Sequence, residues 1–237
     1  MQSPDNTSSM LELQQFHELF VGSSFPTLIT TSTGKKVILK MKGCGNGMIS
    51  LLNEFIANRV AHLLGWPVPD ARLIHIRDDH PWQFGTDEFD DILTRSAGTN
   101  LAIDLIDGAT LLAADEYATL PEDLLSQIYT LDLFFMNIDR AHSSRNLLRD
   151  AVGKIWIVDH GSLLLFSSER AALSDQLFEN HFLFGQKTSY LQRQILDRTL
   201  FREILKSIPP GVFIESGISV ERVHEIITGR IEFLEQR

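Results

Sequence analysis

The sequence predicts an α+β fold of two lobes, a small β-rich N-lobe with one main helix and a mostly helical C-lobe. Three observations support this prediction. β-rich runs fill the first half, one amphipathic helix interrupts them, and apolar residues recur with helical spacing through the second half. The division falls near Ile106, which gives an N-lobe of residues 1–106 and a C-lobe of residues 107–237. Ligands favour the cleft between two such lobes.

Four β-rich runs are the expected strands of the first half. Thr33-Gly34-Lys35 separates the first two of them and is typical of a hairpin turn. The expected strands cover residues 27–31, 37–42, 71–76 and 101–106.

One amphipathic helix lies between the second and third of these strands. Between Met48 and Leu64 the apolar residues recur at steps of three and four, which places them on one helical face. Gly65 and Pro67 end this pattern, as is usual at a helix terminus.

The second half of the chain is mostly helical, with one hairpin inside it. The arms of the hairpin, residues 147–149 and 154–158, are joined by a polar turn that ends in Gly153. The expected helices are the periodic stretches 124–136, 189–208 and 219–234.

The composition is that of a globular protein with a sizeable core. Of 237 residues, 43% are hydrophobic and 22% are charged, which excludes a disordered or fibrous protein. The single cysteine, Cys44, can neither close an internal disulfide nor form a thiolate metal cluster, so we expect a cytoplasmic protein. The start of the chain lacks the features of a signal peptide, and the most apolar run, residues 131–136, is too short to span a membrane.

The charge balance is acidic. The 21 basic and 31 acidic residues give a net charge of -10, and no basic patch offsets it, so we expect no direct nucleic-acid partner. Six acids share one loop-like stretch with Pro81 and Gly85. Because their spacing is irregular, we interpret the stretch as a solvated insertion rather than a metal site. These acids are Asp78, Asp79, Asp87, Glu88, Asp90 and Asp91.

Glu54 lies beside the apolar stripe of the expected helix, where a buried carboxylate needs a cationic partner. Lys40 and Lys42 share one face of the preceding strand, and either can reach it. The alternative is that Glu54 is solvated and that both lysines cover a sheet edge. The local pattern leaves these possibilities open.

A second polar group, Asp139-Arg140, follows the apolar helix at 124–136. Taken alone, this pair is typical of a helix cap or a surface ion pair. If residues 150–153 form the turn of the hairpin, residue 145 opposes residue 158, so Asn146 and Asp159 meet at the open end of the hairpin. Asp139 enters the same end from the helix.

One amide and two carboxylates that converge in this way suit Mg²⁺, which usually keeps several waters and takes further ligands from nucleotide phosphates. His142 and His160 lie nearby and suggest a transition metal instead. Their spacing is not that of a regular metal motif, so we favour magnesium.

These residues follow the order of parts in protein-kinase-like phosphotransferases: a lysine, a helical glutamate, an aspartate with a following asparagine, and Asp-x-Gly. The short sequence motifs around them resemble those of the HipA-like kinases, and the resemblance spans roughly residues 20–165. The matching segments are Gly22-Ser23-Ser24-Phe25-Pro26, Val37-Ile38-Leu39-Lys40, Asn53-Glu54-Phe55-Ile56-Ala57-Asn58, Leu64-Gly65-Trp66-Pro67-Val68-Pro69, Asn137-Ile138-Asp139-Arg140, Asn146-Leu147-Leu148 and Ile157-Val158-Asp159-His160-Gly161.

The resemblance implies a protein-kinase-like fold and an ATP- and Mg²⁺-dependent phosphotransferase, in particular a serine/threonine protein kinase. By position, Lys40 would neutralise the α- and β-phosphates of ATP, and Glu54 would hold that lysine in place. Asp139 would orient or deprotonate the acceptor hydroxyl. Asn146 and Asp159 would hold magnesium.

The resemblance also implies where the rest of the nucleotide lies. Gly22, Ser23 and Ser24 correspond to the loop that covers the phosphates, and Leu105 and Ile106 correspond to the hinge that contacts adenine with backbone groups. In the family, a serine of the phosphate loop can be autophosphorylated, which silences the enzyme. Ser23 and Ser24 are the candidates for this modification.

Two departures from the family pattern define alternatives. The interval from Asp139 to Asn146 is seven residues rather than five, so Ser144, five residues after Asp139, is an alternative metal ligand. Separately, Lys42 is the alternative to Lys40 as the lysine that binds phosphate. HipA toxins also carry an additional N-terminal subdomain, whereas about twenty residues precede Gly22 here. We expect a protein substrate, and an antitoxin-type partner is implied by the family alone.

Two other functional classes compete with a protein kinase. The seven-residue interval, and a phosphate loop at residues 22–24 that lacks the full glycine-rich pattern of eukaryotic kinases, are also compatible with a nucleotide-binding pseudokinase or an interaction module. Asp-Arg followed by a spaced asparagine also resembles phosphoinositide kinases, which suggests a small-molecule or lipid kinase. The net charge of -10 counts against an anionic membrane surface, so we place this class last.

Overall fold

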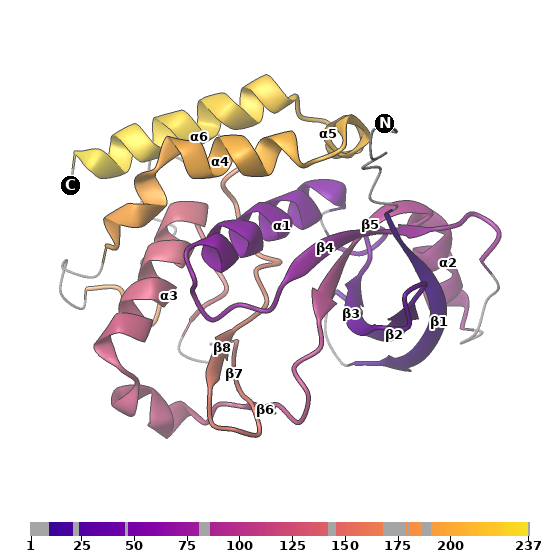
Figure 1. Ribbon diagram of the computed structural model, residues 1–237, viewed down its shortest axis with the longest axis horizontal. Coiled ribbons are helices and arrows are strands. Elements are labelled where there is room, and N and C mark those ends of the chain that lie inside the picture. Colours follow the sequence, from indigo (N-terminus) through magenta and orange to yellow (C-terminus); the bar gives the residue numbers. More distant parts are fainter. Residues whose placement is uncertain are drawn as a thin grey trace, which may run out of the picture.

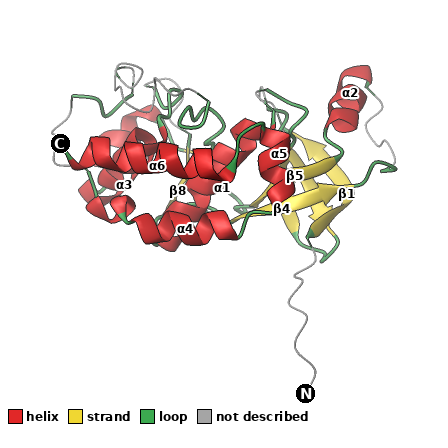
Figure 2. Cartoon of the chain, turned by 90° about the horizontal axis from the view of Figure 1, so that it is seen from above, coloured by secondary structure: helices red, strands yellow, loops and turns green. Residues whose placement is uncertain are grey.

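The computed structural model of the chain describes residues 10–20, 24–45, 47–80, 86–141, 146–167, 179, 181–185 and 191–236. Within these residues the first five strands gather at one end of the molecule and most helices at the other, as the view from above shows (Figure 2). The strand-rich end comes from the first half of the sequence (Figure 1). The expected mixture of helices and strands is therefore confirmed.

Five strands close into a barrel in the order β1-β2-β3-β5-β4. Parallel pairing of β1 with β4 completes the closure, and the other neighbours are antiparallel. Closure removes the free edges of the sheet, which protects it from pairing with other chains. The strands are β1 (Leu11–Leu19), β2 (Thr27–Thr31), β3 (Lys36–Lys40), β4 (Ala71–Ile76) and β5 (Gly98–Asp104).

Strand β1 was not predicted from the sequence. Only Leu13 and Phe16 of its nine residues are buried, and irregularities interrupt its register with β2, so no clean alternation of apolar and polar residues marks it. The expected turn at Gly34 is confirmed, because β2 and β3 form an antiparallel hairpin around it. β5 ends at Asp104, two residues earlier than expected, so Leu105 and Ile106 follow the strand.

Helix α1 (Met48–Leu63) lies between the barrel and the C-terminal helices (Figure 1). The sequence predicted its extent within one residue. Its polar side is largely covered, because three later helices pack around it and leave eleven of its sixteen residues buried. These are α3 (Glu122–Phe135), α4 (Arg198–Lys206) and α5 (Pro210–Ser216). Polar residues on this helix are therefore held in the interior.

Part of the acidic stretch is a helix, α2 (Asp87–Arg95), rather than the expected loop, although Asp87, Glu88 and Asp91 on it are exposed as expected. Thr86 caps the helix by accepting a hydrogen bond from the Phe89 N–H, and acidic residues occupy its first turn, where the helix dipole favours negative charge. Its apolar side, Phe89, Ile92 and Leu93, packs on the barrel core beside Phe16. The proline and glycine at positions 81 and 85 lie outside the described residues.

In the described part of the second half, four further α-helices and two 3₁₀ helices accompany a small sheet. The predicted helix at 189–208 is divided, because Asp197 caps a new helix by accepting from the Thr199 N–H. Pro209 and Gly217 frame a short helix that was not predicted. The elements are η1 (Ala114–Thr119), α3 (Glu122–Phe135), η5 (Arg193–Leu196), α4 (Arg198–Lys206), α5 (Pro210–Ser216) and α6 (Val220–Glu235).

A small sheet, β6 (Thr110–Leu111), β7 (Leu147–Arg149) and β8 (Ile155–Ile157), contains the predicted hairpin. The predicted register was wrong by one residue, because Arg149 pairs with Ile155 rather than with Lys154. Asp150 and Lys154 close the turn instead, through an Asp150 N–H bond to the Lys154 carbonyl. The shift places Asn146 opposite Val158.

Candidate active site

Lys40 and Glu54 form a buried ion pair between the barrel and α1. Lys40 is the last residue of β3 and is 6% exposed, and Glu54 on α1 is fully buried. The Lys40 Nζ and Glu54 Oε1 atoms are 2.7 Å apart. The interpretation of Glu54 as a solvated residue is therefore wrong.

Lys42, the alternative partner of Glu54, lies beyond the end of β3 and pairs with Glu215 of α5, with Nζ 2.5 Å from Oε2. Its backbone N–H donates to the Asn100 side chain at 2.9 Å. The two lysines thus serve different contacts, and only Lys40 reaches Glu54.

Asp159 joins the same cluster from the turn that follows β8. Its Oδ1 atom lies 2.7 Å from Lys40 Nζ, while 47% of its side chain remains exposed. Burial lowers the pKa of Lys40, but the adjacent carboxylates of Glu54 and Asp159 outweigh this effect and raise it above its ordinary value. Burial also tends to raise the pKa of Asp159, and the Lys40 ammonium holds it below its ordinary value. Both shifts favour the charged forms of Lys40 and Asp159, whereas burial raises the pKa of Glu54 above its ordinary value despite the adjacent Lys40 ammonium.

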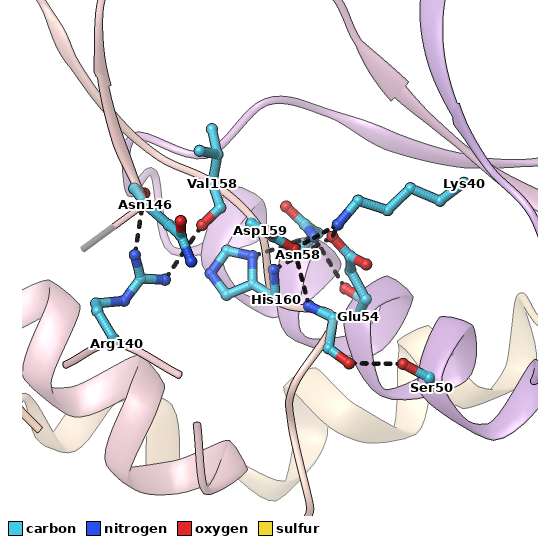
Figure 3. Close-up of polar contacts among 10 residues, drawn as sticks. Lys40, Ser50, Glu54, Asn58, Arg140, Asn146, Val158, Asp159 and His160 are labelled. Carbon is cyan, nitrogen blue, oxygen red and sulfur yellow. Dashed lines mark hydrogen bonds and ion pairs between the residues drawn. The ribbon is translucent and has the colours of Figure 1, made fainter. Parts of the chain in front are cut away.

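Three residues of α1 hold the turn Asp159-His160-Gly161 in place (Figure 3). The Ser50 hydroxyl donates to the Gly161 carbonyl at 2.6 Å, and Glu54 Oε1 accepts from the His160 N–H at 3.2 Å. Asn58 Nδ2 lies 3.4 Å from Nδ1 of His160. Positions 50, 54 and 58 share one helical face because each step is four residues. This polar spacing on an apolar helix was the available sequence signal for Ser50 and Asn58, which were not predicted as site residues.

The segment after α3 places Asp139 at the surface and Arg140 in the interior. Asp139 is exposed, and its N–H donates to the Asn137 side chain at 3.1 Å. Arg140 is fully buried against Asp132 of α3, and the two side chains form an ion pair. The surface-pair interpretation of Asp139-Arg140 is therefore wrong, because the partner of Arg140 is Asp132.

Asp132 is a residue that the sequence did not identify. It is fully buried, accepts from Asn137 Nδ2 at 2.8 Å and lies 2.9 Å from His181 Nε2. Burial alone would raise its pKa, but the Arg140 guanidinium and His181 hold that pKa well below the usual range. The available signal was an aspartate inside an apolar helix, where a charged residue needs partners.

A cavity of about 450 Å³ lies beside the ion pair of Lys40 and Asp159. Lys40, Asn146 and Asp159 line it, as do Leu105 and Ile106 from the segment after β5. A smaller hollow of about 170 Å³ includes Asp139 together with Lys40, Glu54 and Asp159. Ser24 lines both spaces, whereas Gly22 and Ser23 lie outside the described residues.

Asn146 and Asp159 offer oxygen donors at the edge of this cavity. The Asn146 carbonyl accepts from the Val158 N–H at 3.1 Å, so the two residues lie diagonally across the last rung of the hairpin. Both have a positive φ, 51° for Asn146 and 57° for Asp159. The Asn146 amide nitrogen is buried and makes no hydrogen bond within the described part of the chain. Such a donor set fits a hard cation such as Mg²⁺.

Of the two histidines considered for a transition-metal site, the structure describes only His160, and it gives such a site no support. The His160 ring is fully buried, and its Nδ1 atom lies 3.4 Å from the Asn58 amide nitrogen. Burial, and then the nearby Arg140, lower its pKa to about 3. His142 and Ser144 lie outside the described residues. Within the part of the chain that the structure describes, no three His, Cys, Asp or Glu side chains are grouped to hold a metal ion. Among the same residues, no helix is long and apolar enough to cross a bilayer.

The chain is similar to known proteins in sequence and in fold. A protein-family model described as HipA-like kinase matches residues 18–212. No curated protein sequence matches the chain. Among solved structures, a proinflammatory kinase of Helicobacter pylori, CtkA, is similar at 12% identity with a TM-score of 0.61, and 97% of each chain is covered. A MAP kinase of Leishmania major covers 95% of this chain and 80% of its own at 11% identity, but its TM-score of 0.26 supports no shared fold.

Proposed function

Because the chain belongs to the HipA-like kinase family, we propose that it transfers the γ-phosphoryl group of ATP, with Mg²⁺, to serine or threonine hydroxyls of proteins. One observation carries the proposal. The Lys40 ammonium lies 2.7 Å from both Glu54 and Asp159, and the same lysine lines a cavity of about 450 Å³. A cation held by two carboxylates at a cavity wall suits a phosphate chain.

We assign the two ends of the molecule to the two kinase lobes. The barrel with α1, residues 1–106, would be the N-lobe, and residues 107–237 would be the C-lobe. Leu105 and Ile106 connect them and line the cavity, which is where backbone groups of a hinge would contact adenine. The loop that ends at Ser24 would cover the phosphates, because Ser24 lines both the cavity and the smaller hollow.

Lys40 would neutralise the α- and β-phosphates, and Glu54 would keep the lysine in place. Asp139 would accept the proton of the acceptor hydroxyl, whose oxygen bonds to the γ-phosphorus as the bond to the bridging oxygen of ADP breaks. Asp139 is exposed, so an acceptor carried by another protein can reach it. Asn146 and Asp159 would hold Mg²⁺, which supplies positive charge for the transferring phosphate when bound.

Mass spectrometry of the intact protein tests this proposal. The phosphatase-treated protein is incubated with ATP and Mg²⁺, and Asp159→Asn is treated in parallel. We expect added phosphate on the wild type, or formation of ADP with an added protein acceptor, and neither with the variant. A wild type that gains no phosphate and forms no ADP would contradict the proposal.

A nucleotide-binding protein without transfer is the second candidate function. The observation that favours it is the Lys40–Asp159 contact, which engages one oxygen of a proposed metal ligand. Calorimetry separates the two candidates. Magnesium-dependent ATP binding without ADP formation would favour the second one.

A further inference from the structure

Arg140 has the most heavily engaged side chain near the proposed metal ligands. It is fully buried, and its Nε donates to the carboxylate of Asp132. Its Nη1 donates to the Asn146 carbonyl at 3.0 Å, and its Nη2 lies 3.3 Å from the Val158 carbonyl (Figure 3). The guanidinium therefore spans the open end of the hairpin, between the two strands that lead to the proposed ligands.

The backbone at this end of the hairpin needs support. Asn146 itself and Asp159, the residue after Val158, both adopt a positive φ, which is uncommon for residues with a side chain, although Asn and Asp adopt it more readily than most. Arg140 donates to the carbonyl of Asn146 itself and to the carbonyl of Val158, the residue before Asp159. Fixing these carbonyls fixes the direction in which the Asn146 and Asp159 side chains leave the backbone.

The guanidinium is itself held from behind. Asp132 on α3 also accepts from Asn137 and contacts His181, so the anchor of Arg140 is fixed by side chains from other segments. Arginine suits this position because its planar fork donates in several fixed directions at once, whereas a lysine ammonium is a compact charge without that geometry.

We propose that Arg140 is a positioning residue that sets the separation of Asn146 and Asp159 for one divalent cation. This inference rests on the proposed function, in which these two residues hold Mg²⁺. The inference goes beyond the proposed function because it makes the affinity for Mg²⁺ depend on Arg140, a residue that would touch neither the metal nor the nucleotide. A purely structural role for the buried arginine is the competing explanation.

A second buried arginine provides a matched control. Arg230 of α6 is also fully buried and also donates to two backbone carbonyls, those of Phe134, at 3.2 Å, and Leu133. These carbonyls belong to α3, not to the hairpin. Loss of Arg230 should therefore destabilise the fold without moving the proposed metal ligands.

The test compares Arg140→Lys with Arg230→Lys in the full chain. ADP affinity is measured by calorimetry over a series of Mg²⁺ concentrations and in EDTA, and folding is followed by urea unfolding. We expect Arg140→Lys to raise the Mg²⁺ concentration required for tight binding by about tenfold to a hundredfold, as is typical when support of a metal ligand is lost. Affinity in EDTA should stay within about twofold of wild type, and Arg230→Lys should keep the wild-type Mg²⁺ requirement.

A folded Arg140→Lys protein with the wild-type Mg²⁺ requirement would overturn this inference. If the wild type itself binds ADP without any dependence on Mg²⁺, the proposed function fails instead, so the two failures are distinguishable. Should Arg140→Lys not fold, Asp132→Asn weakens the same anchor with a residue of equal size. We expect Asp132→Asn to raise the Mg²⁺ concentration required for tight ADP binding as well, by a smaller factor. An unchanged requirement, or failure of both variants to fold, would count against a specific role in holding metal.

Discussion

The ammonium of Lys40 lies 2.7 Å from the carboxylate of Asp159, although 119 positions separate the two residues in the sequence. The contact joins the last residue of β3 to the turn after β8, and Glu54 completes it from α1. Three elements that share no local sequence signal thus meet in one ionic cluster. Phosphates that bind Lys40 would compete with Asp159 for the same ammonium.

The first prediction separates the two lysines of the first half. Lys40→Gln removes the positive charge from the cluster and should lower phosphate transfer by at least about a hundredfold, as is typical for loss of a charge that stabilises a transition state. Lys42→Gln is the matched control. It breaks a pair with Glu215 in which both side chains are partly exposed, so transfer should stay within about twofold of wild type.

Steady-state rates over a range of ATP concentrations check this prediction, with circular dichroism to confirm folding. Equal losses in both variants would contradict the distinction drawn from the structure. A loss confined to Lys42→Gln would assign the phosphate contact to the alternative lysine.

The second prediction concerns the asparagine of the proposed metal site. Asn146→Ala removes an oxygen donor and should raise the Mg²⁺ concentration for half-maximal activity by about tenfold or more. Ser144→Ala, at the position where related kinases carry their asparagine, should leave it unchanged. Activity against Mg²⁺ concentration is the measurement. The reverse outcome, with the shift in the serine variant, would make Ser144 the ligand.

The third prediction is a pH dependence of stability that arises from His160. Burial lowers its pKa in the folded protein to about 3, whereas in the unfolded chain it returns to its ordinary value of 6.5. Between these values the unfolded state binds one more proton, so stability falls as the pH falls below 6.5. The contribution is about 1.4 kcal/mol per pH unit.

His160→Phe keeps a planar ring and removes this proton, so its free energy of unfolding should depend less on pH between 6.5 and 5 by about that amount. Urea unfolding at several pH values measures the difference. His62→Phe, a change at an exposed histidine of α1, is the control and should keep the wild-type dependence. Identical pH dependence in His160→Phe and wild type would mean that His160 is not held neutral.

Much of the fold could be predicted from local sequence patterns, namely the spacing of apolar residues and the residues typical of turns. The helix from Met48, the hairpin at Gly34 and the strand Ala71–Ile76 have strong periodicity or turn chemistry. The structure has the helix and this strand within one residue, and the second arm of the hairpin ends at Lys40, two residues earlier than predicted. Strand β1 was missed because only two of its residues are buried. Helix α2 was missed because its acidic first turn concealed three apolar residues that face the barrel.

Partner choice was harder to predict than residue type. The local sequence left open whether Glu54 is solvated or pairs with Lys40 or Lys42, and three-dimensional packing decided that Lys40 reaches it and that Lys42 turns to α5. Arg140 was interpreted as the neighbour of Asp139, whereas its partner is Asp132, eight residues earlier. Such pairings depend on how distant elements pack, which periodicity does not encode.

Phosphate transfer itself tests the account most directly. The purified chain is incubated with ATP labelled at the γ-phosphate, Mg²⁺ and an extract of cellular proteins. Asp139→Asn removes the proposed proton acceptor, and Asp107→Asn changes an exposed aspartate outside the cavity lining as a control. We predict labelled protein with the wild type and with Asp107→Asn, and at least about a hundredfold less with Asp139→Asn. Equal labelling by wild type and Asp139→Asn, or no labelling and no ADP with the wild type, would contradict the assignment of this site as a phosphotransferase centre.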